Sequence, residues 1–333
     1  MATGKLLKQL IRSGAEGDIE AFRGAAEQVI EEERDKHHHL LARDLETILY
    51  GCPRTLPSSA LRPLNLSIPE DRERGFPLLT IKEPVRQLAD IVLSPQNKAL
   101  LEQVLHEFNR EDVLRAHGLR PCDRLLFCGP PGCGKTLAAE VIAQELGRPL
   151  AIVRTDSVVS SFLGETAANL RKVFDFIAAS PMVVLFDEFD ALGKERDDAT
   201  EHGELRRVVN AVLQMIDDYT GRSLIIAATN HERMLDTAIW RRFEEVLLLK
   251  PPTPAQLRQL LEVKLRGVRY EFEIDEAAAL PCFRDTSHAD AERIIRRAIK
   301  DVVLEGGELR LHVEHLKKAG QREKARAPKT TLK

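Results

Sequence analysis

The octapeptide GPPGCGKT, from Gly129 to Thr136, has the composition of a loop that binds a polyphosphate. Its glycines allow the backbone to turn inward without Cβ clashes, so that amide N–H groups and the positive end of a following helix can face the phosphates. We expect Lys135 to reach the β- and γ-phosphates and the Thr136 hydroxyl to ligate Mg²⁺. A Gly-Pro surface turn is the alternative, but a strand before the loop and a helix after it favour phosphate binding. The predicted nucleotide-binding set is Gly129, Pro130, Pro131, Gly132, Cys133, Gly134, Lys135, Thr136 and Leu137.

A second set of polar residues follows two apolar segments further along the chain. VVLFDEFD (183–190) places Asp187 and Glu188 after a buried strand, where ligands bind in open α/β sheets. Asp187 suits the Mg²⁺ shell, and Glu188 suits the base that polarises an attacking water. SLIIAATN (223–230) ends on Asn230, whose amide can orient that water. Taken singly, the acidic pair would be a helix cap and Asn230 a turn residue; their position after strands favours the catalytic interpretation.

Arg241 and Arg242, in LDTAIWRRFEE, complete the candidate chemistry. Phosphoryl transfer needs positive charge on the γ-phosphate in the transition state, and an arginine there contributes about 10³–10⁵-fold in rate. Two arginines on a short helix would otherwise be a solvated face.

The elements that must position these residues alternate along the chain. Short apolar runs at 124–128, 149–153, 182–187, 223–229 and 246–249 read as strands. Amphipathic patterns between them predict helices at 135–146, 165–179 and 204–218. Continuous apolar strands separated by helices predict an α/β fold with a parallel five-stranded sheet and helices on both faces.

The remaining segments predict the domain organisation. Residues 1–50 read as a short helical N-terminal region, and 51–84, with six prolines, as a linker that cannot hold a regular element for long. The α/β core spans 85–250. After Pro251 and Pro252 the pattern becomes wholly helical and predicts a lid at 251–320. The basic segment 321–333 is expected to be a disordered tail.

Composition argues against several classes of protein. A net charge of −3 gives no global attraction to nucleic acid or anionic membrane. No apolar run reaches the ~20 residues of a membrane span, and the N-terminus lacks a secretory signal. The five scattered cysteines form no CxxC pair, which favours a reduced, cytoplasmic setting without a disulfide framework. The triplet His37-His38-His39 lies in a charged helical pattern, which favours a solvated helix over a metal tract.

Taken in order, these motifs resemble the AAA branch of the AAA+ ATPases over residues 85–320. GPPGCGKT resembles Walker A, FDEFDALG resembles Walker B, AATN resembles sensor 1, and LDTAIWRRF resembles the second region of homology. The resemblance implies a P-loop ATPase that hydrolyses ATP with Mg²⁺. It also implies a ring, most often a homohexamer, in which Arg241 and Arg242 act on the ATP of the neighbouring copy.

A further resemblance concerns the work that hydrolysis performs. SSFLGETAANLRKVFDFI is similar to the family's first pore loop, with Phe162, Leu163 and Gly164 on the positions that grip a polypeptide. EHGELRRVVNAVLQMIDD is similar to the second pore-loop segment of the katanin–spastin–fidgetin group, and the short N-terminus resembles bacterial stand-alone AAA ATPases. The implied function is remodelling or unfolding of a protein substrate, reached directly or through an adaptor or neighbouring-gene partner. That Phe162 and Leu163 only cap the core remains the alternative.

One departure from the family and two rival functions remain open. Where the lid usually carries Ser-Gly-Ala-Asp at the adenine, this chain has Ser287-His288-Ala289-Asp290, which puts the adenine contact in doubt. One rival is a nucleic-acid machine, such as a helicase loader or transposition helper. It would use the cations Arg206, Arg207, Arg293, Arg296, Arg297, Lys317, Lys318, Arg322, Lys324 and Arg326. The other is a scaffold that binds ATP without turnover, against which the intact Glu188 argues.

Overall fold

The computed structural model divides into two units, Met1–Arg62 and Pro63–Lys333. In the second unit it describes residues 67–71, 75–159, 163–189, 211–230, 240–275, 278–306 and 310–326. In the first it describes seven scattered residues between Arg12 and Val29, all of them helical. The histidines 37–39 and most of the predicted N-terminal region therefore lie outside the described residues.

Six strands form the central sheet in the order β1-β3-β4-β5-β2-β6. The five strands predicted from the sequence are all present and all parallel, so the predicted fold class is confirmed. They are β2 (Arg124–Cys128), β3 (Leu150–Val153), β4 (Val183–Phe186), β5 (Leu224–Thr229) and β6 (Glu245–Leu248). Because β2 lies between β5 and β6, and β5 lies beside β4, the ends of these strands meet at one edge of the sheet.

The sixth strand, β1 (Leu79–Lys82), pairs antiparallel with β3 and falls inside the segment 51–84 that we expected to be a linker without lasting regular structure. Its four residues avoid the prolines, and Leu78 and Leu79 are buried in the core. Lys82 Nζ lies 2.7 Å from Glu140 Oε2, and this ion pair links the strand to helix α6 (Lys135–Glu145). The linker expectation is therefore wrong for this stretch, and the core begins before residue 85.

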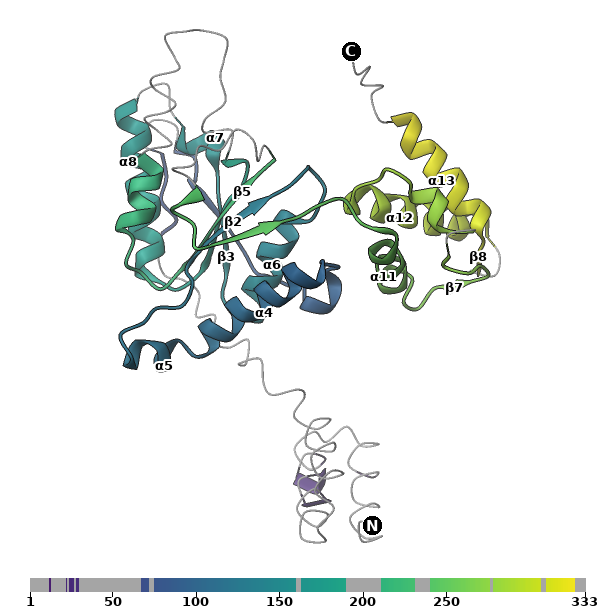
Figure 1. Ribbon diagram of the computed structural model, residues 1–333, viewed down its shortest axis with the longest axis horizontal. Coiled ribbons are helices and arrows are strands. Elements are labelled where there is room, and N and C mark those ends of the chain that lie inside the picture. Colours follow the sequence, from purple (N-terminus) through teal and green to yellow (C-terminus); the bar gives the residue numbers. More distant parts are fainter. Residues whose placement is uncertain are drawn as a thin grey trace. The chain divides into compact units, whose positions relative to one another are not determined.

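Alternate side chains of the strands bury the sheet on both faces. In β4, Val184 and Phe186 join one hydrophobic cluster, whereas Val183 and Leu185 join another. Helix α8 (Leu163–Ala179) and the helical residues 211–218 cover the first face. Helices α4 (Pro95–Asn109) and α6 (Lys135–Glu145) cover the second (Figure 1). Two-sided burial accounts for the nearly uninterrupted apolar runs seen in the sequence.

Short elements connect these layers. The 3₁₀ turn η2 (Leu88–Asp90) precedes α4, and α5 (Glu111–Ala116) follows it. Helix α7 (Thr155–Val158) joins β3 to the segment before α8. No helix among the described residues is long and apolar enough to cross a membrane.

The lid has its own hydrophobic core, built on α11 (Pro254–Lys264), the 3₁₀ turn η5 (Leu280–Phe283), α12 (His288–Glu305) and α13 (Val313–Arg326). Thr253 and Ser287 are the N-caps of α11 and α12, and each forms a capping box. The lid is not wholly helical, because β7 (Arg269–Tyr270) pairs in parallel with β8 (Arg310–Leu311).

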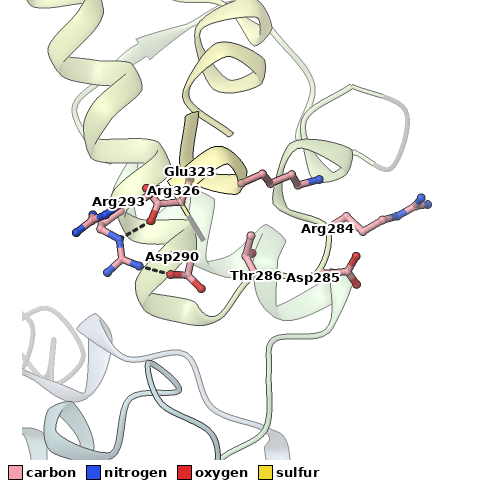
Figure 2. A pocket seen from close by; sticks show the side chains of 8 residues that line it. Arg284, Asp285, Thr286, Asp290, Arg293, Glu323 and Arg326 are labelled. Atoms are coloured by element: carbon pink, nitrogen blue, oxygen red, sulfur yellow. Dashed lines mark hydrogen bonds and ion pairs between the residues drawn. The ribbon is translucent and has the colours of Figure 1, made fainter. Parts of the chain in front are cut away.

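Helix α13 also corrects the predicted tail, since it continues to Arg326, six residues into the segment 321–333 that we expected to be disordered. Two features hold this helix. Leu316 and Ala319 are fully buried, and Glu323 accepts a hydrogen bond from Arg293 of α12 at 2.9 Å (Figure 2). Glu323, a buried acidic residue among basic ones, therefore holds α13 in place. The charged composition of this segment had suggested a solvated tail instead.

Candidate active site

Residues Gly129–Thr136 are called the phosphate loop below; they comprise the loop after β2 and the first two residues of α6. Its three glycines have positive φ, at 150° for Gly129, 75° for Gly132 and 95° for Gly134. A Cβ on Gly129 would lie 1.9 Å from the Leu249 carbonyl oxygen, and one on Gly132 would lie 2.5 Å from Ser287 Oγ. The first two glycines therefore permit close approach of other segments, while Gly134, with open space around it, supplies the left-handed start of α6.

Lys135 links the phosphate loop to the end of β5. Its Nζ donates to the carbonyl oxygens of Gly129 at 2.7 Å and Pro130 at 3.0 Å, and to Asn230 Oδ1 at 2.7 Å. The residue is only 7% exposed, so its charge is held in a partly desolvated position above the loop. Lys135 and Asn230, which are 95 positions apart in sequence, are therefore brought together.

Thr136 makes the corresponding link to the end of β4. Its Oγ1 donates to Asp187 Oδ2 at 2.8 Å, and the backbone N–H of Glu188 donates to Asp187 Oδ1 at 2.9 Å. Glu188 is exposed, and its φ of 51° lies in the left-handed region, which a glutamate rarely occupies. Such strain is concentrated at active sites, where the surrounding structure holds a residue in a conformation that the reaction needs.

These residues fit ATP and Mg²⁺. The phosphate loop offers an ammonium group and the N-terminus of α6 to anionic oxygens, and Thr136 and Asp187 are two oxygen ligands of the kind that Mg²⁺ takes. Thr136 and Asp187 would hold Mg²⁺, which would supply positive charge to offset the negative charge that develops on the phosphate. Lys135 would orient the terminal phosphate, Asn230 would hold the position of the attacking water, and Glu188 would accept its proton.

The lid contacts the phosphate loop at the beginning of α12. The Ala289 N–H donates to the Gly132 carbonyl at 3.0 Å, and Ser287 Oγ donates to Asp290 Oδ2 at 2.7 Å. Between them, both ring nitrogens of His288 are buried without a hydrogen-bond partner among the described residues, and burial lowers the pKa of the ring. A neutral, unpaired imidazole therefore stands where the sequence put the adenine contact in doubt.

Cys133, the one thiol of the phosphate loop, is buried. Burial raises the pKa of its thiol, and Lys135 offsets part of that rise. The side chain therefore stays protonated at neutral pH and acts as a small apolar residue within the hydrophobic cluster that also contains residues of α4 and α6.

Arg241 and Arg242 lie away from the phosphate loop of their own chain. Arg242 Nε donates to Asp217 Oδ2 at 2.8 Å, and Asp217 in turn lies beside Arg124, the first residue of β2. The phosphate loop follows the last residue, Cys128. Four residue steps of strand, about 13 Å, separate these two ends. Of the predicted pore loop, Phe162 lies outside the described residues, and Leu163 and Gly164 form the first turn of α8.

The sequence did not reveal three features of this site. The left-handed backbone of Glu188 and the closeness of Leu249 to Gly129 depend on segments far apart in the chain, and no sequence signal marks them. The contact of Ala289 with Gly132 had a signal in Ser287-His288-Ala289-Asp290, which the sequence associated with the adenine, but the sequence gave no geometry for it. The lid cavity of about 510 Å³ is lined by residues of the lid alone and is separate from the phosphate loop.

Comparison with known proteins agrees with this geometry. The profile of the "ATPase family associated with various cellular activities (AAA)" matches residues 125–251. The "Uncharacterized AAA family ATPase y4kL" of Sinorhizobium fredii is 45% identical over 92% of this chain and 91% of its own length. The "ATP-dependent zinc metalloprotease FtsH 1" of Sphaerobacter thermophilus is 32% identical over 70% of this chain, which spans 36% of that protein.

A solved structure supports the fold independently. The crystal structure of the FIGL-1 AAA domain superposes with a TM-score of 0.58 at 23% identity, over 74% of this chain and 85% of that domain. Three findings agree. The fold is alike, the family profile matches over the phosphate loop, and the chain is 45% identical to a relative along about nine-tenths of its length. This chain belongs to the AAA ATPases and is an enzyme that hydrolyses ATP with Mg²⁺.

Proposed function

We propose that this ATPase works as a ring of identical copies, most often six in the family it belongs to, and uses hydrolysis to remodel or unfold a protein drawn through a central pore. Each site is completed by Arg241 and Arg242 of the adjacent copy. The observation that carries the proposal is the position of these arginines at the end of the sheet opposite the phosphate loop of their own chain.

Three contacts support that position. The Glu244 N–H donates to the Arg124 carbonyl at 3.0 Å, and both Arg242 and Arg124 contact Asp217. The turn that carries Arg241 and Arg242 is therefore held at the beginning of β2. Arginines there do not reach a phosphate bound after Cys128 in the same chain. When two copies contact each other through different surfaces, repeating the contact can close a ring if the rotation between neighbouring copies allows it. In such a ring, the arginine pair of each copy would lie at the phosphate loop of the next.

A protein substrate is supported by two observations. Residues 162–164 immediately precede or begin α8, which packs on the same sheet face as Phe186, the residue before Asp187. Movement at the Mg²⁺ ligand can therefore pass through a packed helix to the predicted pore loop. The relative FtsH 1 is named as a protease, an enzyme whose substrates are proteins.

The structure weakens the rival nucleic-acid function. Several of the cations that could have contacted phosphates are already paired with carboxylates. Arg293 and Arg297 pair with Glu323, Arg296 pairs with Glu292, and Arg322 pairs with Asp301. The pairs of Arg293, Arg297 and Arg322 join α12 to α13, and the pair of Arg296 lies within α12.

Shared sites can be tested with two inactive variants. Lys135→Ala removes the phosphate lysine but keeps the arginines, whereas Arg242→Ala keeps the phosphate loop. We expect each to be inactive alone, and an equal mixture to regain about a quarter of the wild-type turnover, because about a quarter of random contacts pair an intact loop with intact arginines. No recovery in mixtures shown to contain both chains would refute the sharing of sites.

The pore is tested separately with Phe162→Ala. This variant should keep basal ATP turnover and lose remodelling of proteins that a Glu188→Gln chain retains in the presence of ATP. Unchanged remodelling by Phe162→Ala would refute the pore mechanism while leaving the shared site intact.

A further inference from the structure

The lid cavity, about 510 Å³ in volume, lies between the turn that precedes α12 and the C-terminal end of α13. Figure 2 shows Arg284 and Asp285 on one side of it and Arg293 and Glu323 on the other. Its volume falls within the range of sites for small molecules, about 300–1,000 Å³. Such sites are mostly apolar, whereas seven of the eight residues that line this cavity are charged. The cavity is therefore suited to a charged ligand.

The charges of the lining do not all neutralise one another. Arg293 holds two of the carboxylates, because its Nη2 donates to Asp290 Oδ1 and its Nε donates to Glu323 Oε1 at 2.9 Å. The charged lining residues that remain are Arg284, Asp285, Lys324 and Arg326. Three cations therefore face one carboxylate, which leaves an excess of two positive charges.

These three cations are available to a ligand. Arg284, Lys324 and Arg326 are exposed, and none of them makes an ion pair with any residue that the structure describes. Cations that line one cavity repel one another unless an anion lies among them. A guanidinium presents parallel donors that match phosphate oxygens, and a lysine adds a point charge. A phosphate group, with a charge of about −2 at neutral pH, matches the excess in both geometry and charge.

The cavity shares one residue with the contact between the lid and the phosphate loop. Asp290 lines the cavity, and its Oδ2 accepts hydrogen bonds from the Ser287 N–H at 3.0 Å and from Ser287 Oγ at 2.7 Å. Ser287 Oγ is so close to Gly132 that a Cβ on that glycine would lie 2.5 Å from it. An anion in the cavity and the polyphosphate of a bound nucleotide would therefore both act on this turn.

We propose that the lid cavity is a regulatory site for a phosphate dianion, free or carried by a small molecule, which Arg284, Lys324 and Arg326 hold. The bound dianion would compete with Asp290 for Arg293, and its charge would repel the polyphosphate of ATP. Occupation of the cavity should therefore weaken ATP binding, and ATP should weaken binding in the cavity by the same factor. This inference goes beyond the proposed function, since it requires ATP binding but neither a ring nor a protein substrate.

Binding is measured by calorimetry on the full chain saturated with ADP and Mg²⁺, so that the phosphate loop is occupied. The probes are ribose 5-phosphate, ribose and inorganic phosphate. We expect ribose 5-phosphate to bind and ribose, which lacks the dianion, not to bind. Inorganic phosphate that binds as tightly as ribose 5-phosphate would identify the free ion as the ligand, whereas weaker binding would identify a phosphorylated small molecule.

Variants assign this binding to the cavity. Arg284→Gln/Arg326→Gln should weaken the binding of ribose 5-phosphate at least about tenfold, because it removes two sets of charge-assisted hydrogen bonds. Arg296→Gln is the matched control and should bind as the wild type does, because Arg296 pairs with Glu292 and does not line the cavity. Failure of both phosphate probes to bind the wild type, or equal binding by the wild type and the double variant, would overturn the site. If the double variant does not fold, Lys324→Gln decides, and unchanged affinity in it would overturn the site.

ATP turnover tests the coupling to the nucleotide. Saturating ribose 5-phosphate should raise the KM for ATP about fivefold in the wild type and in Arg296→Gln, and leave it unchanged in Arg284→Gln/Arg326→Gln. An equal rise in the double variant would show that the probe competes at the phosphate loop, and it would overturn the regulatory role. An unchanged KM in the wild type would overturn it as well.

Discussion

At the scale of single residues, Glu188, which we propose as the catalytic base, has an unfavourable backbone conformation. Its φ of 51° is tolerated by asparagine far better than by glutamate or glutamine. We predict that Glu188→Asn raises the free energy of unfolding by about 0.5–1 kcal/mol while lowering ATP turnover at least about 100-fold.

Glu188→Gln is the matched control, because it removes the same charge without relieving the backbone. It should lose turnover and leave the denaturant midpoint near that of the wild type. Equal stability of the Asn and Gln variants would show that Glu188 is not strained.

The glycines of the phosphate loop should differ in their tolerance of a methyl group. At Gly129 the new Cβ meets the Leu249 backbone at 1.9 Å, so Gly129→Ala should cost about 3 kcal/mol or more of stability. At Gly134 there is space and only the positive φ opposes alanine, so Gly134→Ala should cost about 1 kcal/mol. Denaturant unfolding of the two variants measures this; similar losses at both positions would contradict the packing of Leu249 on the loop.

His288 should make the stability of the lid depend on pH. Because burial lowers the pKa of His288, the unfolded chain takes up a proton below about pH 6.5 while the folded chain does not. Stability from this residue is therefore complete above pH 6.5 and falls as the pH drops toward the lowered folded pKa. Between pH 7.5 and 5.5 we expect a smaller loss of unfolding free energy in His288→Leu than in the wild type, and an equal loss in both would refute this role.

At the scale of elements, the sequence predicted what depends on local pattern. All five parallel strands and the helices that follow β2 and the pore-loop segment were placed correctly, because two-sided burial produces apolar runs and helices produce a 3.6-residue period. β1 was missed because four residues beside a proline-rich segment become a strand only when they pair with β3, far along the chain.

Helix α13 was missed for a different reason. Its charged composition resembles that of a solvated tail, and its fixation depends on partners in α12 that local pattern does not reveal. The phosphate, Mg²⁺ and water positions were predicted with their strands, whereas Asp217 and the conformation of Glu188 required the folded chain. Motif spacing locates a site along the sequence, but orientation within the site comes from distant segments.

The role of Glu323 in holding α13 can be tested directly. Its side chain is 10% exposed and interacts with both Arg293 and Arg297, as Figure 2 shows for Arg293. Glu323→Gln should lower the stability of the lid by about 1–3 kcal/mol, because it removes the carboxylate that Arg297 contacts and leaves Arg293 paired with Asp290 alone. Arg296→Gln, at a pair whose arginine is 63% exposed, should change stability by less than about 0.5 kcal/mol. Thermal unfolding compares the two, and equal losses would remove Glu323 as the anchor of α13.

At the scale of the whole molecule, the account depends on copies that complete one another. A single chain holds the phosphate loop, Asp187 and Glu188 at one end of its sheet, and Arg242 at the other. The catalytic set that we propose is therefore distributed so that a lone copy has only part of it near its own nucleotide. Assembly and turnover should be inseparable.

The most direct measurement is ATP turnover per chain as a function of protein concentration, with native mass followed in the same samples. We predict that turnover per chain is near zero where the protein is a single copy, rises steeply as rings form, and levels off when assembly is complete. Full turnover per chain in samples that contain only single copies would contradict the account.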